Sequence, residues 1–379
     1  MFCAVPSVPA AASGSNEEKT SPASDDIGLL AQSAILIDAE TGNVLYEHNA
    51  DERHGPASVT KIMTLLLIVE ALERGEFSLD DTVSASAEAS SLGGSQIYLK
   101  EGETLSVRDM IKSIVIASAN DAAYAMGEFV SGSNDAFVRR MNERAHELGM
   151  NNTHFVNAHG LDDDDHYTSA RDIAVMSREL ISHKMIFDYT KIRLDSIRDG
   201  AFTLTSTNKL LRSYEGITGL KTGSTSKSLF SMSATAERDG VSLIAVVMTS
   251  PTGDDRFKDA ARLLDYGFER YTKFTAAEKE KNPEPMTVLN GKSDLLTLSL
   301  EKEPGFLVLK EDAPRITGRA LLPDSVKAPI SQGQKVGNLI YTLDGEVIAD
   351  VPIIAAESVE KLNVGYCLML LLKSVFSIG

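Results

Sequence analysis

The sequence predicts an α+β fold followed by a small all-β domain, on three observations. Strand-like apolar runs flank a turn at residues 33–51 and again at residues 232–250. Between these two hairpins, apolar residues recur at helical spacing. After about residue 275 the chain changes to short apolar runs separated by turns, which is typical of a separate β domain. Because 379 residues can form one large core and one smaller one, two domains are expected.

Local patterns predict the elements of the first region in chain order. SAILIDAETGNVLYEHNAD places apolar runs on both sides of the turn Glu40-Thr41-Gly42-Asn43, and MSATAERDGVSLIAVVMTS does the same around Arg238-Asp239-Gly240. Residues 59–73 are apolar on nearly all sides, which predicts a helix buried in the core. Amphipathic spacing predicts four more helices, at residues 106–131, 134–148, 169–182 and 255–272.

The second region follows a charged, proline-bearing stretch, EKEKNPEP, which indicates a linker. Beyond it, turn pairs such as Asn290-Gly291 and Asp344-Gly345 separate the short apolar runs, as expected of a small β domain. The predicted organisation is an N-terminal tail (1–27), a main domain (28–274), a linker (275–285), a small β domain (286–358) and an apolar C-terminal helix (359–379).

The two ends of the chain indicate where in the cell the protein is expected. Residues 1–27 begin with a short apolar stretch and an Ala-x-Ala-like cluster and then become rich in Ser and Pro. This is typical of the remnant of a secretory signal that lacks its basic start, and a disordered tail is the alternative. The C-terminal VGYCLMLLLKSVFSIG is interrupted by Lys373 and is too short to span a bilayer. We expect this segment either to lie in a membrane interface or to dock on the protein itself.

Composition excludes several classes of partner and site. A net charge of −17 argues against a basic surface of the kind that binds nucleic acid, so no nucleic-acid partner is expected. Cys3 and Cys367, at opposite ends, provide neither a disulfide framework nor a CxxC metal pair. Three histidines close to the acidic run 162–165 fit no compact zinc pattern; these are His154, His159 and His166. We therefore expect no metal and no cofactor.

The segment PASVTKIMT carries a chemical signal. Ser58 and Lys61 are three residues apart, so on a helix they share one face of the first turn. A serine hydroxyl is a weak nucleophile until a base takes its proton, and a lysine that burial keeps neutral can be that base. One S-x-x-K is common by chance, because helices often begin with serine, so this pair needs support from elsewhere in the chain.

Two further motifs supply that support. Ser118-Ala119-Asn120 is a polar triplet inside an apolar segment, where the hydroxyl and amide groups need partners. Lys221-Thr222-Gly223 is expected at a strand edge, where the glycine allows close approach and the cation and hydroxyl suit a substrate carboxylate. Taken alone, the second of these motifs could equally be an exposed strand start.

The order S-x-x-K, S-x-N, K-T-G resembles that of penicillin-binding proteins and serine β-lactamases. Nearly all of residues 30–272 resembles the D-alanyl-D-alanine carboxypeptidases, the low-molecular-mass penicillin-binding proteins of peptidase family S11. The region after residue 285 resembles their second domain, and the C-terminal apolar segment resembles their membrane-anchoring helix. The resemblance implies a serine β-lactamase/DD-peptidase-like antiparallel sheet flanked by helices.

The resemblance also implies a role for each residue of the motifs. Ser58 would be acylated, with Lys61 as its general base, and Ser118 and Asn120 would relay protons and hold the substrate. Lys221 and Thr222 would bind the terminal carboxylate of the substrate. The remaining predicted binding residues are Gly223, Ser224 or Thr225 for the oxyanion hole together with the Ser58 N–H, and Arg256 as a second anchor or a solvated surface residue. Many relatives have a bulky residue after K-T-G, where this chain reads KTGSTSKSLF, which leaves the subsite shape open.

The resemblance implies a secreted, membrane-associated serine D-Ala-D-Ala carboxypeptidase at the outer face of the cytoplasmic membrane. It would remove the terminal D-alanine of peptidoglycan stem pentapeptides, be inhibited by β-lactams, and reach the membrane surface through its C-terminal helix.

Two alternatives remain. A class A-like serine β-lactamase shares the three motifs, but no E-x-x-L-N lies between Asn120 and Lys221, and such an enzyme needs no second β domain. A non-catalytic penicillin- or peptidoglycan-binding module is disfavoured by the intact Ser58 and Lys61. A Ser/His/Asp hydrolase is disfavoured because the chain has no G-x-S-x-G elbow.

Overall fold

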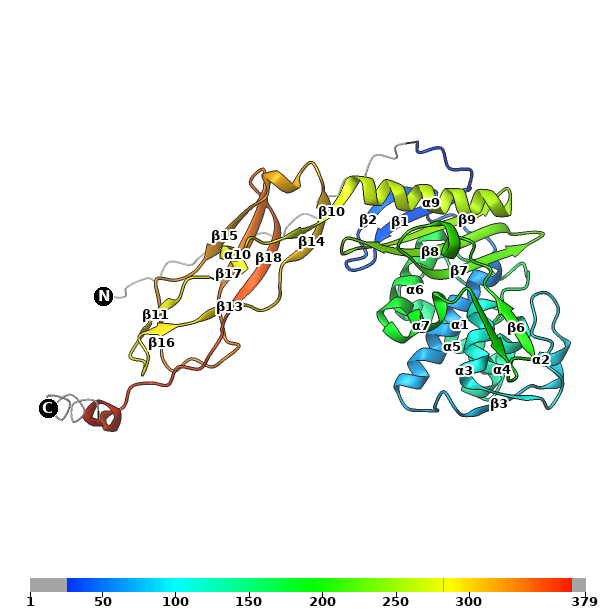
Figure 1. Cartoon of the computed structure of the whole chain (residues 1–379), viewed down its shortest axis with the longest axis horizontal. Helices are drawn as coiled ribbons and strands as arrows, with labels where there is room; N and C mark the ends of the chain where they lie inside the picture. Colours follow the sequence, from blue (N-terminus) through cyan, green and yellow to red (C-terminus); the bar gives the residue numbers. More distant parts are fainter. Residues whose placement is uncertain (1–25, 282, 370–379) are drawn as a thin grey trace, which may run out of the picture.

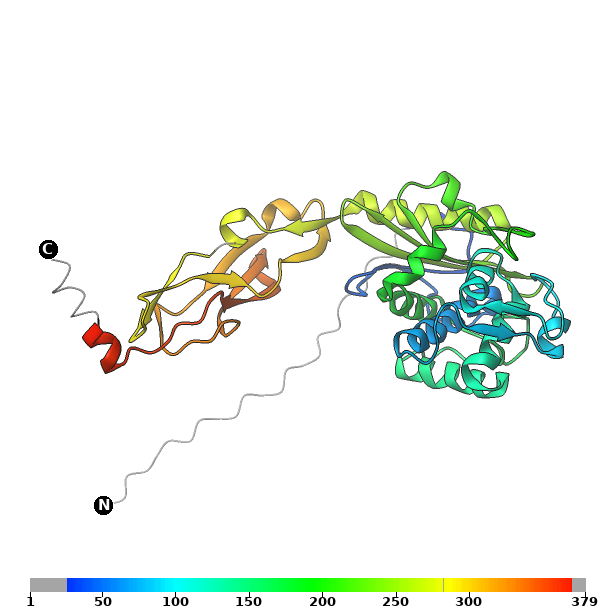
Figure 2. The same ribbon diagram turned by 60° about the horizontal axis from the view of Figure 1, so that its bottom comes forward.

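The computed structural model describes residues 26–281 and 283–369, which form two bodies joined end to end (Figure 1). The larger body contains the first part of the chain and the smaller one the last, and a view turned by 60° shows the same separation (Figure 2). The predicted signal remnant and the end of the predicted C-terminal helix lie outside the described residues.

The larger body is built on a five-stranded antiparallel sheet. In spatial order its strands are β2 (Val44–His48), β1 (Ser33–Asp38), β9 (Val241–Ser250), β8 (Leu229–Arg238) and β7 (Ile217–Thr225). Both predicted hairpins are present, as the β1–β2 and β8–β9 pairs. The two ends of the main domain therefore meet in one sheet through the β1–β9 pairing.

Both faces of this sheet are buried. Along β1, Ile35 and Ile37 belong to the core shared with the helical part, whereas Leu36 between them belongs to the core under α9 (Gly253–Arg270). This alternation is the period of two of a strand. Because neighbouring positions of β9 are likewise buried on opposite sides, that strand is apolar almost throughout.

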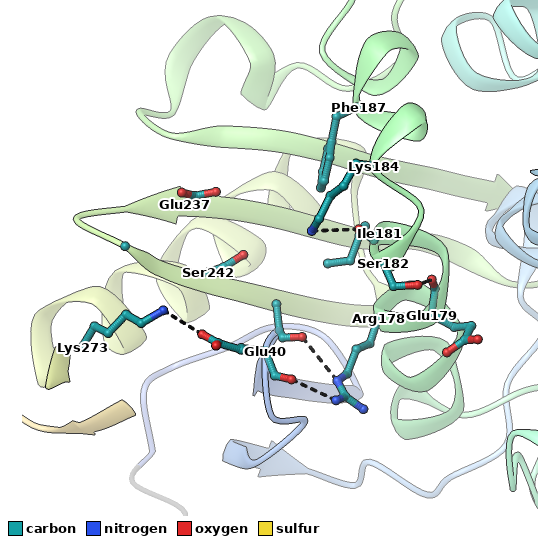
Figure 3. A pocket seen from close by; sticks show the side chains of 12 residues that line it. Glu40, Arg178, Glu179, Ile181, Ser182, Lys184, Phe187, Glu237, Ser242 and Lys273 are labelled. Carbon is teal, nitrogen blue, oxygen red and sulfur yellow. Dashed lines mark hydrogen bonds and ion pairs between the residues drawn. The ribbon is translucent and has the colours of Figure 1, made fainter. Parts of the chain in front are cut away.

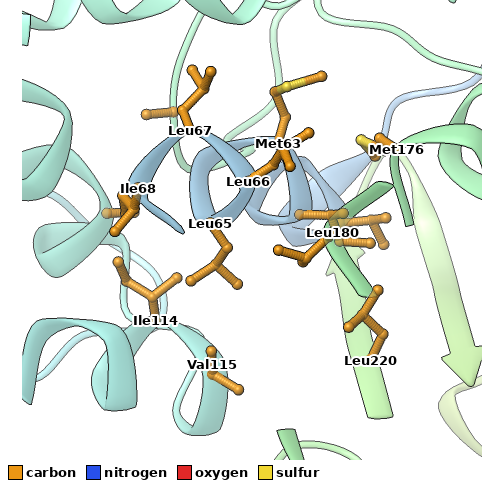
Figure 4. Close-up of a cluster of buried hydrophobic side chains, with 14 of the residues drawn as sticks. Met63, Leu65, Leu66, Leu67, Ile68, Ile114, Val115, Met176, Leu180 and Leu220 are labelled. Carbon is orange, nitrogen blue, oxygen red and sulfur yellow. The ribbon is translucent and has the colours of Figure 1, made fainter. Parts of the chain in front are cut away.

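The helical part packs around α1 (Lys61–Glu73), whose residues Ile62 to Val69 are all buried. In Figure 4, Leu65 of α1 lies close to Ile114 and Val115, and Leu180 lies on another side of the same helix. The other helices of this body are α2 (Ala87–Ser91), α3 (Val107–Ile116), α4 (Asn120–Ser131), α5 (Asn134–Glu147), α6 (Ala170–Ser182), α7 (Phe187–Thr190) and α8 (Leu210–Ser213). The short strands β3 (Thr82–Ser84) and β4 (Thr104–Ser106) pair, as do β5 (Leu194–Ile197) and β6 (Phe202–Thr205).

One predicted helix is wrong. Residues 106–131 form two helices, α3 and α4, with a break at residues 117–119. Ser118 in this break has a φ of 62°, which no α-helix accommodates. The first two residues of the helix predicted at 59–73 belong to a 3-10 turn, η1 (Ala57–Thr60), and the α-helix begins at Lys61. The helix predicted at 255–272 begins at Gly253 and ends at Arg270.

The smaller body is all-β apart from short helical turns, as predicted. Its first strand, β10 (Tyr271–Thr275), directly follows α9 and pairs with β14 (Gly305–Leu309). The other strands are β11 (Met286–Leu289), β12 (Leu295–Leu296), β13 (Leu298–Leu300), β15 (Thr317–Leu321), β16 (Ser325–Lys327), β17 (Lys335–Leu343) and β18 (Glu346–Ala355). Tyr341 and Ile353 are fully buried in its own core. The second body thus begins within residues that the sequence placed in the main domain.

The chain continues past β18 into a helical turn at residues 364–369, the last described residues. Val364, Leu368 and Met369 of this turn are exposed. Among the described residues, no helix is long and apolar enough to cross a bilayer.

Candidate active site

Ser58 lies in η1, the turn that leads into α1. Ala57 just before it has a φ of 47°, in a region that residues with a Cβ rarely adopt. Glycines lie close on two sides: a Cβ on Gly160 would lie 1.9 Å from the Ala57 carbonyl oxygen, and a Cβ on Gly223 would lie 2.9 Å from the Val59 nitrogen. Close backbone packing that requires glycine therefore fixes the position of Ser58.

Lys61 begins α1, and its side chain is fully buried. Its Nζ lies 3.0 Å from Ser58 Oγ, 2.7 Å from Asn120 Oδ1 and 2.6 Å from the His159 carbonyl oxygen. These three acceptors match the three N–H donors of an ammonium group. When Lys61 is neutral, its lone pair is within reach of the Ser58 proton.

Ser118 and Asn120 lie where the chain leaves α3 and enters α4. The left-handed backbone at Ser118 places its Oγ 2.8 Å from Lys221 Nζ. Asn120 directs Oδ1 to Lys61 and donates from Nδ2 to the Gly93 carbonyl oxygen at 2.7 Å. The S-x-N segment therefore connects two lysines that lie on a helix and a strand.

The K-T-G residues lie in β7, the edge strand of the sheet. Lys221 and Thr222 are buried, and Thr222 Oγ1 lies 2.7 Å from Thr207 Oγ1. Gly223 is the position at which β7 approaches η1. An edge strand leaves alternate backbone groups unpaired on its outer side, so β7 can bind an extended peptide beside Ser58.

Two buried lysines in one site have lowered pKa values. Burial, and then the charge of Lys221, lowers the pKa of Lys61 well below its usual value, although the Asp121 carboxylate opposes this change. Burial, and then the charge of Arg256, lowers the pKa of Lys221 to about 7. The lowered pKa makes the neutral form of Lys61 easier to reach than that of an exposed lysine, and such perturbed groups are typical of active sites.

Arg256 lies in α9 and is buried rather than solvated, so the alternative of a surface arginine is wrong. It donates from Nη1 to the carbonyl oxygens of Gly223 at 2.9 Å and Ser231 at 3.4 Å. Its guanidinium also lies 4.6 Å from the ring centroid of Phe257. Arg256 thus supports the K-T-G strand at a carbonyl. Ser224 and Thr225 continue β7 toward its end.

Sequence reasoning missed several groups that complete the site. Asp162 accepts hydrogen bonds from Thr225 Oγ1 at 2.7 Å and Ser228 Oγ at 3.0 Å, so it ties the end of β7 to the loop before α6. The run of four aspartates at 162–165 could have indicated that this loop contacts the site. His159 and Gly93 contribute backbone carbonyls, for which no side-chain pattern exists.

The histidines considered as metal ligands have other roles. His166 is buried; its Nδ1 accepts from the Val156 N–H at 3.0 Å, and its Nε2 lies 2.7 Å from Thr60 Oγ1. Elsewhere among the described residues, a ring nitrogen of His183 and carboxylate oxygens of Glu70 and Glu179 lie within 4.8 Å of one another. Arg144 already bridges those two carboxylates at 2.8 and 2.6 Å.

A hollow of about 560 Å³ lies next to the β8–β9 turn and the end of α6 (Figure 3). Arg178 donates to the carbonyl oxygens of Ala39 and Glu40, and Lys273 pairs with the Glu40 carboxylate. Most of the charged groups drawn in Figure 3 thus have hydrogen-bond or ion-pair partners nearby. None of the predicted site residues lines this hollow.

Comparison with known proteins shows the family of the chain. Residues 18–252 match the D-alanyl-D-alanine carboxypeptidase family of S11 peptidases, and residues 271–361 match the C-terminal domain of penicillin-binding protein 5. The D-alanyl-D-alanine carboxypeptidase DacF of Bacillus subtilis is 40% identical over 335 residues, which cover 87% of this chain and 86% of DacF.

Solved structures have a similar fold. Penicillin-binding protein 5 of Haemophilus influenzae has a TM-score of 0.73 at 29% identity, covering 88% of this chain and 98% of its own. Penicillin-binding protein D2 of Listeria monocytogenes, in its ampicillin-bound form, has a TM-score of 0.60 at 36% identity, covering 64% of this chain and 100% of its own. The chain therefore belongs to the D-alanyl-D-alanine carboxypeptidase family, the serine peptidases of family S11.

Proposed function

We propose that the protein removes the terminal D-alanine from peptidoglycan stem pentapeptides through an acyl-enzyme on Ser58. The observation that carries this proposal is the position of Lys61, whose Nζ is 3.0 Å from Ser58 Oγ in surroundings that lower its pKa. A base already within hydrogen-bond distance of the hydroxyl is what a serine nucleophile requires. The names of the relatives support the substrate class.

Acylation follows from the contacts of the site. Neutral Lys61 takes the Ser58 proton while Oγ attacks the carbonyl carbon of the penultimate D-alanine. The N–H of Ser58 and an N–H at Ser224 or Thr225 stabilise the oxyanion that forms. The peptide bond then breaks, and a proton relayed through Ser118 leaves with the amine of the terminal D-alanine. Water, deprotonated by Lys61, hydrolyses the ester and restores Ser58.

Lys221 and Thr222 provide the charge and hydroxyl that bind the terminal carboxylate of the substrate. β-Lactams present a carbonyl and a carboxylate in a similar arrangement. Attack by Ser58 Oγ on the lactam carbonyl would break the ring C–N bond, and the amine that forms would stay covalently attached to the acyl group, so no leaving group departs. We therefore propose that they acylate Ser58 and remain attached. The ampicillin-bound form of the Listeria relative supports this step.

The test combines labelling by a fluorescent penicillin, intact-mass analysis and D-alanine release from diacetyl-Lys-D-Ala-D-Ala. One acyl group per chain is expected on the wild type and none on Ser58→Ala. Loss of this hydroxyl removes one of the three acceptors of the Lys61 Nζ, so we expect it to lower the stability by about 1–3 kcal/mol and to leave the chain folded. Ser331→Ala, at an exposed position of the smaller body, is the matched control.

The alternatives give different results in the same experiment. Label without D-alanine release would indicate a binding module, and rapid turnover of the label would indicate a β-lactamase. Persistent labelling of Ser58→Ala at another serine would contradict the assignment of the nucleophile.

We also propose that the protein acts outside the cytoplasmic membrane, with its C-terminal segment in the membrane interface. The exposed apolar side chains of Val364, Leu368 and Met369 support this proposal, since water is an unfavourable environment for such a cluster. Its test is given in the Discussion.

A further inference from the structure

The K-T-G strand runs into a short turn with a strained backbone. β7 ends at Thr225 and β8 begins at Leu229, so residues 226–228 reverse the chain. Thr225 and Leu229 are partners in the β7–β8 register, and Leu229 has a φ of 52°. A left-handed backbone is unfavourable for a bulky residue and persists only where the surroundings impose it. Contacts from outside the turn are therefore needed to hold this end of β7.

Asp162 supplies such contacts from the loop between α5 and α6. Its Oδ1 accepts from Thr225 Oγ1 at 2.7 Å and from Ser228 Oγ at 3.0 Å. The Ser228 N–H in turn donates to Thr225 Oγ1 at 2.9 Å. Hydrogen bonds to a charged acceptor are stronger than those between neutral groups, so one carboxylate oxygen holds both ends of the turn. We call Asp162, Thr225 and Ser228 the turn clamp.

The turn clamp also packs against the chain that carries the nucleophile. Ser228 is buried, and a Cβ on Gly55 would lie 2.3 Å from its Oγ. Gly55 precedes Ser58 by three residues, in the segment that leads into η1. The Ser228 hydroxyl therefore contacts Asp162 and lies against the backbone just before the nucleophile. A displacement of the turn would be felt on both sides of the site.

The turn clamp lies at the end of the strand that would supply an oxyanion donor. β7 is an edge strand, so β8 supports it on one side only. On its other side, Lys221 Nζ donates to Ser118 Oγ at 2.8 Å, and η1 approaches at Gly223. The N–H proposed to stabilise the oxyanion belongs to Ser224 or Thr225, between Gly223 and the turn clamp. Such a donor is effective only when it is held in place, and a misplacement of about 1 Å can cost 100-fold in rate.

We propose that Asp162 is a positioning residue for the proposed reaction: through the turn clamp it holds the end of β7 so that the backbone N–H points at the oxyanion. In this role Asp162 does not touch the substrate. Its loss should slow the chemical step, in which the negative charge develops, more than it weakens substrate binding, which depends on Lys221 and Thr222. The inference rests on the proposed function and adds the residue that aligns its oxyanion donor.

The test measures kcat and KM for D-alanine release from diacetyl-Lys-D-Ala-D-Ala, together with the thermal unfolding of each variant. Asp162→Ala removes the acceptor of both hydroxyls, so we expect kcat to fall at least about tenfold while KM changes less than about twofold. Asp162→Asn keeps an oxygen acceptor at the same position and should retain most of the activity. Thr225→Val removes the hydroxyl but keeps the side-chain shape and the backbone N–H. It should also lower kcat, and it tests the turn clamp even if Asp162→Ala does not fold.

Asp164→Ala is the matched control on the same loop. Asp164 pairs with Lys227 of the turn, but both side chains are mostly exposed, and exposed ion pairs contribute little. Its kcat should therefore equal that of the wild type. Combining Asp162→Ala with Thr225→Val should cost much less than the product of the two single losses, because both substitutions remove the same hydrogen bond.

Three results would overturn the inference while the proposed function stands. An equal loss in Asp164→Ala and Asp162→Ala would mean that only the order of the loop matters. A rise in KM at unchanged kcat would place Asp162 in substrate binding, and single losses that multiply in the double variant would mean that the two residues act independently. If the wild type released no D-alanine, the proposed function would fail, and this inference with it.

Discussion

Lys61 is a buried cation at the start of a helix whose next eight residues are nearly all apolar. Removing an ammonium group from water is costly unless its donors find acceptors. Here the Ser58 hydroxyl, the Asn120 amide and the His159 carbonyl are those acceptors. The same burial, together with the charge of Lys221, lowers the pKa. One environment thus both positions the proposed base and favours the neutral form that can accept a proton.

Substituting Lys61 with Arg separates charge from basicity. A guanidinium stays protonated and cannot accept the Ser58 proton. Lys61→Arg should therefore lower the rate of acylation by penicillin at least about 100-fold, the usual contribution of a general base. Stopped-flow labelling measures this rate, and Lys258→Arg on exposed α9 surface is the control. Near-normal acylation would mean that Lys61 acts only as a fixed charge.

His166 supports the nucleophile through a chain of hydrogen bonds. The Val156 N–H donates to Nδ1, so the proton of the neutral ring is on Nε2, which donates to Thr60 Oγ1. Thr60 in turn donates to the Ala57 carbonyl oxygen at 2.8 Å, one residue before Ser58. Protonation of Nδ1 would break the bond from Val156. Burial lowers the pKa of His166 to about 4, which favours the neutral ring.

This arrangement predicts a loss of stability in acid. Between the unfolded pKa of 6.5 and the folded pKa of about 4, the unfolded chain binds more protons, so stability is fully present above 6.5 and declines as the pH falls. His166 alone accounts for at most about 3 kcal/mol of this decline. His166→Gln should reduce the loss seen in urea unfolding between pH 7 and about pH 4, whereas exposed His48→Gln should not. An unchanged pH profile for His166→Gln would contradict this role.

At the residue scale, the three motifs predicted side chains that the structure does bring together: Lys61 contacts Ser58 and Asn120, and Lys221 contacts Ser118. Their catalytic roles stay predictions. The sequence could not predict Asp121 or the carbonyls of Gly93 and His159. Their contribution depends on which loops meet at the site, and a backbone carbonyl has no signature in sequence.

At the scale of elements, the break between α3 and α4 shows where periodicity fails. The pattern of apolar residues continues through 106–131, so it predicts one helix. The backbone instead leaves helical geometry at Ser118 and Ala119, which turns Ser118 toward Lys221 and places Asn120 beside Lys61. The geometry of the site thus overrides the local pattern of apolar residues, as is common at functional positions.

The packing of η1 against its neighbours gives a prediction at the same scale. Gly160 has a φ of 87°, and a Cβ there would lie 1.9 Å from the Ala57 carbonyl oxygen. Gly160→Ala should therefore displace the Ser58 turn and lower the rate of acylation at least about tenfold. It should also lower the free energy of unfolding by more than the ~1–2 kcal/mol that a left-handed backbone costs an alanine.

Gly149→Ala is the matched control for that substitution. Gly149 has a similar φ of 74°, but a Cβ there would meet nothing within 4 Å. Gly149→Ala should lower the stability measured by thermal unfolding, because alanine is strained at this φ, but it should be acylated at the wild-type rate. If the two variants acylated equally, the close approach of Gly160 to η1 would not be what positions Ser58.

At the scale of the whole molecule, two hairpins at the ends of the main domain predicted a sheet, and turn pairs after residue 285 predicted a β domain. The boundary between the two bodies was harder to predict from the sequence. The first residues of β10 continue the helical pattern of α9, and the pairing of β10 with β14 is visible only in the structure. The second body thus continues directly from α9, and its far end carries the chain toward the C-terminal helical turn (Figure 1).

That turn provides the last prediction. Truncation after Asn363 removes the exposed Val364, Leu368 and Met369 but keeps the bridge between Gly291 and Lys361 and the bond from the Leu362 N–H to the Asn290 carbonyl oxygen. The smaller body should therefore stay folded, and release of D-alanine from a soluble peptide should be unchanged. Sedimentation with anionic phospholipid vesicles should be lost, because the apolar side chains and Lys373 that favour such a surface are absent. Vesicle binding equal to that of the full chain, or unfolding of the smaller body, would show that the segment is a docked structural element and that the membrane proposal is wrong.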